Sequence, residues 1–291
     1  MIQPPTGPVG LLERLQDKRP LMAVELRPPR ANLTRADSME TWIDLFHAFR
    51  RLAAEKTFLF VTDNAVGDAE EENLWHLTTN LAGEVDPSTI VPFLTCKHSL
   101  EYCLLYASRA SARGIQAVTV VGGDASEGQP RCVPHAFALR HVLAERLPTL
   151  ALGGWTNLHR DPEQQMSFLL DQGFGADYYL TQVVSHHDAR RIGSWLELTR
   201  RHGLALPGIF GVFLYRNARP AMLERLARFF PVPAEAVTRE FESGATPEEI
   251  CARSIVALRR MGANKIYLCN LGGRRAAQRY LRIAEAVDNL L

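Results

Sequence analysis

Short apolar runs alternate with longer segments whose apolar residues recur at helical spacing, from residue 21 to the end of the chain. Continuous apolar runs are typical of strands covered on both faces, as in a parallel sheet. The pattern predicts eight strands, at residues 21–25, 57–62, 89–95, 117–121, 149–153, 177–181, 208–213 and 265–269. It predicts helices at residues 11–16, 38–55, 70–81, 99–113, 135–146, 162–172, 188–202, 220–230, 247–261 and 273–289.

Eight strand–helix repeats in 291 residues are typical of the (β/α)8 barrel. A doubly wound sheet is the alternative, but the chain has no GxGxxG motif after its first strand and no change of composition at mid-chain. We therefore predict an α/β fold, a (β/α)8 TIM barrel. A single domain is expected to span residues 1–291, with a short N-terminal extension over residues 1–20.

The first predicted strand, at residues 21–25, ends in a carboxylate, Glu25, and the prolines Pro28 and Pro29 stop it shortly afterwards. A carboxylate held at the end of a buried strand is poorly solvated, and burial raises its pKa. A raised pKa suits a general acid. A helix cap or a surface ion pair is the alternative reading of Glu25.

Polar and aromatic residues also follow the other strands at their carboxyl ends. A (β/α)8 enzyme builds its active site at this face of the barrel, so these residues are candidates for one site. They are Thr62–Asn64, Thr95–Cys96, Asp124, Trp155 with His159, Thr181–Gln182, Tyr215 and Asn270.

The 33 basic and 32 acidic residues nearly balance, which does not favour a nucleic-acid or membrane-surface partner. The five cysteines form no CxxC pair, which favours a reducing compartment, and no signal-peptide pattern is present, so we expect a cytoplasmic protein. His186 and His187 look like a metal pair, but the sequence shows no acidic partner at ligand spacing. No metal site is therefore predicted.

The motifs at the strand ends resemble those of the methylenetetrahydrofolate reductase family, in the same order, over about residues 21–271. VELRPPR, which contains Glu25, looks like that family's FEFFPPK, and PFLTC looks like its HLTC. VVGGD is similar to LRGD, and GADYYLTQ is similar to AGADFIITQ. The remaining similar segments are FVTDNAVGD, GGWTNLH with DPEQ, PGIFGV and IYLCNL.

The resemblance implies an oxidoreductase that reduces 5,10-methylenetetrahydrofolate with NAD(P)H, normally through bound FAD. It makes Glu25 the general acid and places Asp124, Gln182 and Tyr215 on the folate. It places the cofactor against Thr62, Thr95, Asp124, Trp155 and His159. A homo-oligomer is compatible with the resemblance.

The departures from the family concentrate on the flavin. Gly122 stands where the family has an Arg, and the alignment puts Asp171 where the family has a Lys near the diphosphate. A diphosphate prefers cations around it, so FAD is expected to bind weakly or not at all. Hydride transfer directly from NAD(P)H is then the second route. A non-catalytic or accessory paralogue, which binds folate or a methyltransferase, is the alternative function.

Overall fold

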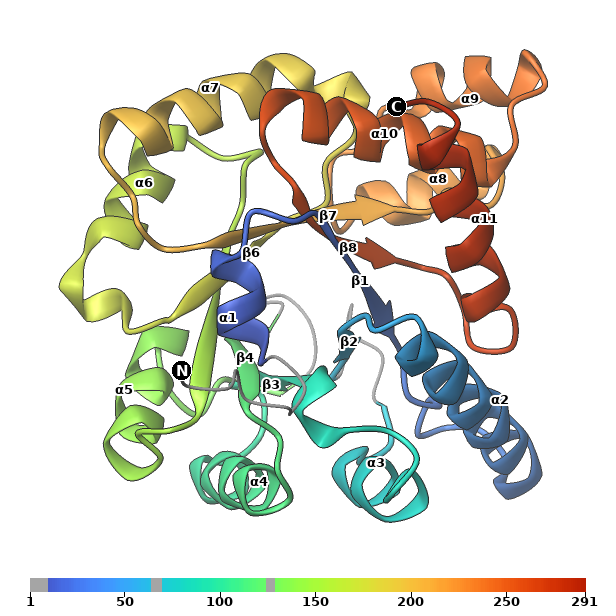
Figure 1. Cartoon of the computed structure of the whole chain (residues 1–291). Helices are drawn as coiled ribbons and strands as arrows, with labels where there is room; N and C mark the ends of the chain where they lie inside the picture. Colours follow the sequence, from blue (N-terminus) through green and yellow to red (C-terminus); the bar gives the residue numbers. More distant parts are fainter. Residues whose placement is uncertain (1–9, 64–69, 124–128) are drawn as a thin grey trace, which may run out of the picture.

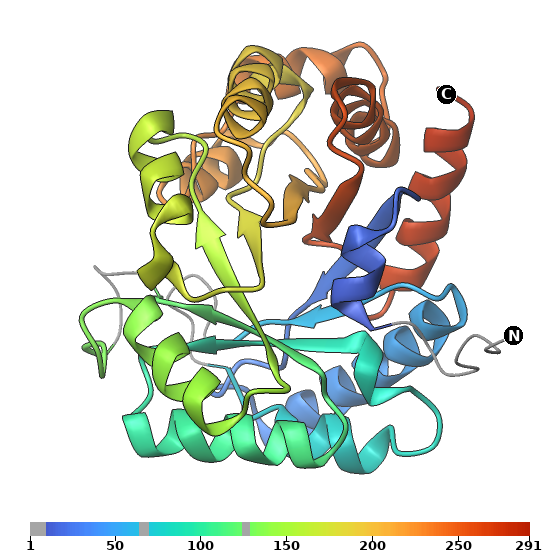
Figure 2. The same cartoon turned by 60° about the vertical axis from the view of Figure 1, so that its left-hand side comes forward.

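The computed structural model describes residues 10–63, 70–123 and 129–291. Within these ranges eight parallel strands close into a barrel in the order β1 to β8, which confirms the predicted (β/α)8 fold. Figures 1 and 2 show the helices arranged around the outside of the strands. The strands are β1 (Leu21–Leu26), β2 (Leu59–Val61), β3 (Ile90–Thr95), β4 (Ala117–Val121), β5 (Ala151–Thr156), β6 (Tyr178–Thr181), β7 (Gly208–Phe213) and β8 (Lys265–Cys269).

The helices lie close to their predicted positions, with two differences that concern function. A helix that the pattern did not predict, α9 (Ala234–Glu242), lies between β7 and β8, and the helix predicted from residue 70 begins only at Leu74. The others are α1 (Leu11–Gln16), α2 (Arg35–Ala54), α3 (Leu74–Asn80), α4 (Leu100–Ala112), α5 (Ala136–Arg146), α6 (Pro162–Leu170), α7 (Ala189–Arg201), α8 (Pro220–Ala227), α10 (Pro247–Met261) and α11 (Ala276–Asp288).

Helix α2 begins at Arg35, three residues before the predicted start at residue 38. Thr34 caps this helix, because its hydroxyl accepts a hydrogen bond from the backbone N–H of Asp37. Ser38 lies one turn inside the helix, buried, and its hydroxyl donates to Glu71 over 2.5 Å.

Side chains alternate along each strand between the interior of the barrel and the layer under the helices. In β1, Ala23 packs with Phe60 and Tyr267 inside the barrel, whereas Val24 belongs to the apolar layer that contains Trp42 of α2. The same alternation decides which residues at the strand ends face the mouth of the barrel, the end where the strands finish.

Helix α1 lies across the opposite end of the barrel, where the strands begin (Figure 1). Leu11 and Leu15 pack into the interior cluster. The buried ammonium of Lys265, at the start of β8, donates to the carbonyls of Arg14 (2.7 Å), Asp17 (2.5 Å) and Arg19 (2.8 Å). These three bonds hold the end of α1 and the turn that follows it against the start of β8.

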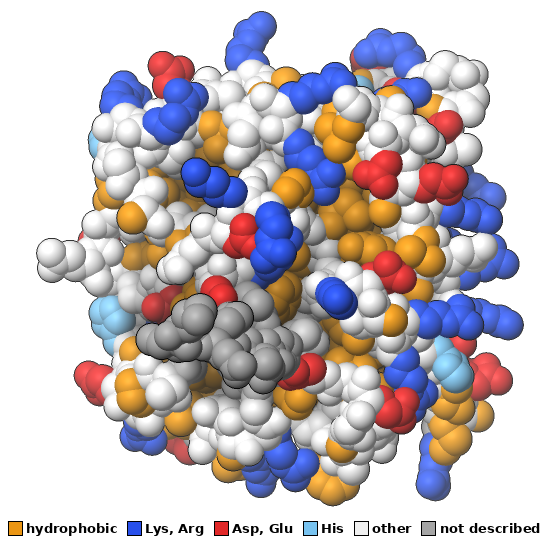
Figure 3. Space-filling model, viewed as in Figure 1, with side chains coloured by type: hydrophobic (Ala, Val, Ile, Leu, Met, Phe, Trp, Pro, Cys, Tyr) orange, Lys and Arg blue, Asp and Glu red, His pale blue; other side chains and the backbone are white. Residues whose placement is uncertain are grey.

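In the part of the chain that the structure describes, no helix has the length and apolar character needed to cross a membrane. Acidic and basic side chains are interspersed on the face seen in Figure 3. This mixture agrees with the balanced charge of the sequence.

Candidate functional site at the mouth of the barrel

Glu25, the predicted general acid, faces the interior at the mouth. The register pairs Glu25 with Phe60 of β2 and Ala23 with Tyr267 of β8. The Cys269 thiol donates to Glu25 Oε2 over 3.4 Å. Burial raises the pKa of the Glu25 carboxyl, while Arg27 and the thiol hydrogen bond act in the opposite direction. The carboxyl is therefore held toward its protonated form, as the sequence predicts for a general acid.

Four aromatic rings form a floor below the mouth, which we call the aromatic floor: Phe60, Phe93, Trp155 and Tyr267. Phe60 lies 6.0 Å from Phe93 and 6.1 Å from Tyr267 between ring centroids, and Trp155 lies 6.5 Å from both of these rings. The contacts thus close a circle across the barrel. Phe60 and Tyr267 are fully buried and Phe93 is nearly so, whereas Trp155 is partly exposed, so a flat ring that enters the mouth would meet the floor at Trp155.

A second carboxyl, Glu70, was missed in the sequence, where it was placed at the start of a helix. Arg30 and Glu70 instead form an isolated β-bridge. Both Glu70 oxygens lie within 3.0 Å of the Thr62 hydroxyl, and Oε1 also accepts from Arg27 Nε over 3.1 Å. Burial raises the pKa of Glu70 to about 7, despite Arg27 and the Thr62 hydrogen bond. The hydroxyl of Thr62, which was predicted to line a cofactor, is thus hydrogen-bonded to Glu70.

Thr95, at the end of β3, is held by its backbone, which donates to Asp63 Oδ2 over 2.7 Å. Asp63 also lies 2.7 Å from His98 Nε2. The Thr95 hydroxyl is buried, but its oxygen has no hydrogen-bond partner among the described residues. A buried polar atom without a partner costs free energy, so this hydroxyl is a candidate contact for a ligand.

His159 connects the loops after β5 and β6, and Gln182 connects the loop after β6 to the segment after α8. His159 Nε2 lies 2.8 Å from the carbonyl of Val183. Gln182 Oε1 accepts from the backbone N–H of Val183 (2.9 Å), and Nε2 donates to the carbonyl of Phe229 over 3.5 Å. The long second bond leaves the amide able to exchange it for a ligand.

Tyr215, predicted to stack on substrate, lies two residues beyond β7. Its ring is 5.1 Å from that of Phe213, which in turn lies 5.2 Å from Phe230. Only 6% of Tyr215 is exposed, and burial raises the pKa of its hydroxyl. A substrate would therefore meet the edge of this aromatic cluster rather than a free face of Tyr215.

The sequence indicated that the family's cations near the FAD diphosphate are lost at Gly122 and Asp171, and the structure changes this conclusion. Asp124 lies outside the described residues, but Gly122 and Gly123 before it are described. A Cβ at Gly122 would lie 2.9 Å from Cζ of Arg131, whose Nη2 donates to the carbonyl of Gly123 over 2.7 Å. Arg131 therefore places a guanidinium against the glycine that replaces the family's Arg. Its Nε is buried without a hydrogen-bond partner among the described residues.

The expectation that Asp171 faces the diphosphate is wrong for a site at the mouth. Asp171 caps the short turn η3 (Gln172–Phe174), where its carboxylate accepts from the N–H of Gly173 over 2.6 Å. This turn leads into β6, and the segment before a parallel strand lies at the end of the barrel opposite to the mouth.

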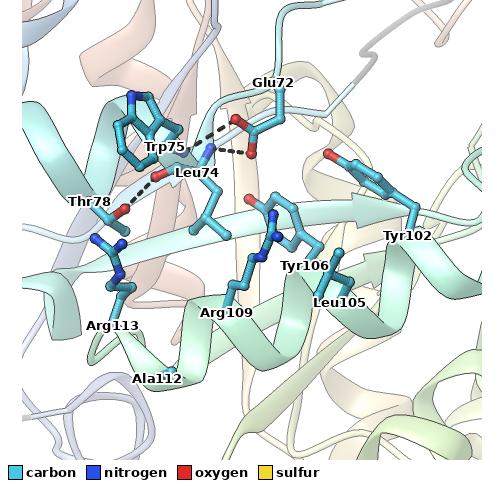
Figure 4. Close-up of a pocket in the computed structure, with 10 residues that line it drawn as sticks. All are labelled: Glu72, Leu74, Trp75, Thr78, Tyr102, Leu105, Tyr106, Arg109, Ala112 and Arg113. Atoms are coloured by element: carbon cyan, nitrogen blue, oxygen red, sulfur yellow. Dashed lines mark hydrogen bonds between the residues drawn. The ribbon is translucent and has the colours of Figure 1, made fainter.

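Two further features lie outside the set of residues just described. His186 and His187 contact Glu240, an acidic partner that the sequence did not reveal because α9 was not predicted. A cavity of about 530 Å³ lies on the outside of the barrel, between α3 and α4, and Figure 4 shows the side chains around it. None of the predicted site residues lines this cavity, whose walls include Trp75, Tyr106 and Arg109.

No family model matches the sequence, and no curated protein matches it significantly. Solved structures do resemble it. One is described as an uncharacterized protein from Clostridium thermocellum that binds two copies of 5-methyl-5,6,7,8-tetrahydrofolic acid. It has a TM-score of 0.65 and 16% identity, over 96% of this chain and 98% of that chain.

A second similar structure is an F420-dependent secondary alcohol dehydrogenase in complex with an F420–acetone adduct. Its TM-score is 0.56 at 12% identity, over 92% of this chain and 99% of that chain. At such low identity both likenesses establish the (β/α)8 fold, and function must be argued from the site.

Proposed function

We propose that this chain is an oxidoreductase of the methylenetetrahydrofolate reductase type, which uses NAD(P)H to reduce 5,10-methylenetetrahydrofolate to 5-methyltetrahydrofolate. The observation that carries the proposal is Glu25, a carboxyl with a raised pKa at the mouth of the barrel, next to the aromatic floor. The similarity to a structure that binds 5-methyltetrahydrofolate supports the same substrate class.

In this reaction Glu25 gives its proton to a nitrogen of the folate's five-membered ring. One carbon–nitrogen bond then breaks, the bridging carbon becomes an iminium, and a hydride completes the methyl group. The Cys269 thiol, 3.4 Å from Oε2, stabilises the carboxylate that remains until Glu25 takes a new proton from water. Gln182 would orient the pterin through its amide, which offers donors and an acceptor together.

The residues at the mouth fit a dinucleotide cofactor. Trp155, the partly exposed ring of the aromatic floor, can meet a flat ring. The Thr95 hydroxyl and Arg131 Nε lack partners among the described residues, and a guanidinium suits a phosphate. A bound nicotinamide dinucleotide, with or without a flavin, would supply the hydride. Arg131 removes part of the charge argument against FAD, so both routes, through FAD and directly from NAD(P)H, remain within the proposal.

The test is oxidation of NADH and of NADPH by the purified chain with 5,10-methylenetetrahydrofolate, with and without added FAD. Flavin released on denaturation should be measured in the same preparation. Turnover that needs FAD identifies the flavin route, and turnover without any flavin identifies the direct route. Folate binding without turnover under both conditions would contradict the proposal and favour the accessory paralogue.

A further inference from the structure

A cluster of three side chains outside the mouth has the composition of a transition-metal site. His186 and His187 lie on the turn η4 (His186–Asp188), which follows β6, and Glu240 lies on α9, more than fifty positions later in the chain. Each residue offers one ligand atom, and these atoms all lie within 4.8 Å of one another. Two imidazoles and a carboxylate are a ligand set that Zn²⁺ prefers.

Two of the distances between the donors are close to the edges of a tetrahedral site. His186 Nε2 lies 3.3 Å from Glu240 Oε1, and His187 Nε2 lies 3.0 Å from Oε2. Zinc–ligand bonds of about 2.0–2.2 Å give a tetrahedron whose edges are about 3.3–3.6 Å. Small rotations of the side chains therefore suffice for the three atoms to share one ion.

Neighbouring groups orient the ligands as they do around metal-binding histidines. His186 Nδ1 lies 2.9 Å from Ser254 Oγ, which lies 3.4 Å from the carbonyl of Ile250. The imidazole can thus donate at Nδ1 and present the lone pair of Nε2 to an ion. Arg253 Nη1 donates to Glu240 Oε1 over 2.7 Å, which fixes the carboxylate and leaves Oε2 for coordination.

Solvent can supply a fourth ligand, because the cluster is only partly buried and His187 borders a cavity. A cavity of about 380 Å³ is lined by His187 together with Leu158, Arg191 and Trp195, among other residues. The side chains of His186, His187 and Glu240 are 21%, 22% and 13% exposed, so water can reach an ion held between them. Three protein ligands plus water complete a tetrahedral coordination shell.

The geometry points to a Zn²⁺ site formed by His186, His187 and Glu240, which clamps α9 to the turn after β6. Both segments connect to the mouth: Gln182 lies four residues before His186, and its amide already reaches Phe229, between α8 and α9. The ion would therefore hold two loops that border the candidate site in fixed positions. This inference does not depend on the proposed reaction.

The experiment is a calorimetric titration of the untagged, EDTA-treated full chain with Zn²⁺ alone, followed by thermal unfolding with and without the ion. We expect one Zn²⁺ per chain and a higher Tm in its presence. His187→Ala and Glu240→Gln should each weaken binding by at least about 100-fold, because a direct ligand is lost. Ser254→Ala should weaken it by about 10- to 100-fold, because only the orientation of His186 is lost.

His202→Ala is the matched control. His202 Nε2 lies 3.6 Å from Glu163 Oε2, so it is also a histidine beside a carboxylate, but among the described residues this pair belongs to no group of three ligands. This variant should keep the affinity and the Tm increase of the wild type. Zn²⁺ binding by the His187→Ala variant that is as tight as in the wild type, or a wild type without one tight site, would overturn the inference. Unfolding of each metal-free variant shows whether the fold itself has changed.

Discussion

Replacement of Glu25 by Gln tests the proposed mechanism most directly, because it removes an acidic proton and little else. The amide has nearly the shape of the carboxyl, and its oxygen can accept the Cys269 hydrogen bond that Glu25 Oε2 accepts over 3.4 Å. Since burial disfavours the charged carboxylate, the neutral amide should not destabilise the fold. A loss of rate can then be assigned to the missing proton.

The expected loss follows from the value of a positioned general acid. Such a group typically contributes about 10²–10⁴-fold in rate, which corresponds to about 3–5.5 kcal/mol of activation free energy. Glu70 should not replace Glu25, because both of its oxygens are held by Thr62 and one of them also by Arg27. We therefore expect the kcat of Glu25→Gln to be about 10²–10⁴-fold lower than that of the wild type, with a much smaller change in folate affinity.

The assay is steady-state oxidation of NAD(P)H with 5,10-methylenetetrahydrofolate, as a function of pH. Because Glu25 acts in its protonated form, the rate of the wild type should fall as pH rises through the raised pKa, and Glu25→Gln should lose this dependence. Glu70→Gln should cost much less than Glu25→Gln. Glu72→Gln is the matched control, since Glu72 accepts from the backbone of Leu74 at the start of α3, outside the barrel.

Near wild-type turnover by Glu25→Gln would remove this residue from the mechanism. If Glu70→Gln instead abolished turnover and the basic limb of the pH profile, Glu70 would be the acid. Either result would refute the reasoning from the buried strand end.

Three other perturbations test the site and the fold. Gln182→Ala should weaken folate binding by about 1–3 kcal/mol in a calorimetric titration, because a buried hydrogen bond is lost, and unchanged affinity would place the pterin elsewhere. Lys265→Met should lower the free energy of unfolding by about 3 kcal/mol in a urea titration, since three carbonyls lose a charged donor, and an unchanged midpoint would show that α1 is held otherwise. The pKa of Glu70 is raised from 4.5 to about 7 on folding, so its stabilising contribution is complete below pH 4.5 and is lost as pH rises through 7. The loss is at most about 3 kcal/mol, and the difference between Glu70→Gln and the wild type across this range measures it.

The barrel could be predicted from the sequence because the pattern that specifies each of its strands lies within a few consecutive residues. Each strand is a continuous apolar run, and β4, β7 and β8 begin and end at the predicted residues. Helix α9 was missed because it follows Pro233 and has only one fully buried residue, Val237, so its apolar pattern is weak. Without α9, Glu240 could not be brought near His186, and the metal-binding cluster remained invisible.

The inward direction of Glu25 and Trp155 could also be predicted, since both stand at the ends of strands where alternation fixes the direction of the side chain. Glu70 could not be found in this way. It precedes α3 in an extended segment, and its raised pKa depends on burial against Thr62, eight residues earlier. Residues 70–72 are three consecutive glutamates, and nothing in the sequence of that segment distinguishes Glu70 from Glu71 and Glu72.

At the end of β4, a positive charge that the motif places at one sequence position is supplied by a residue at another position. The sequence has Gly122 where the related motif has Arg, and this difference alone predicts a lost cation. In the structure the glycine makes room for one: a Cβ at Gly122 would come within 2.9 Å of the Arg131 guanidinium. Gly122→Arg would therefore displace Arg131 rather than add a charge to an empty place. The mouth can present a cation to a phosphate from a different position in the chain, so the changed motif is no longer evidence against a dinucleotide.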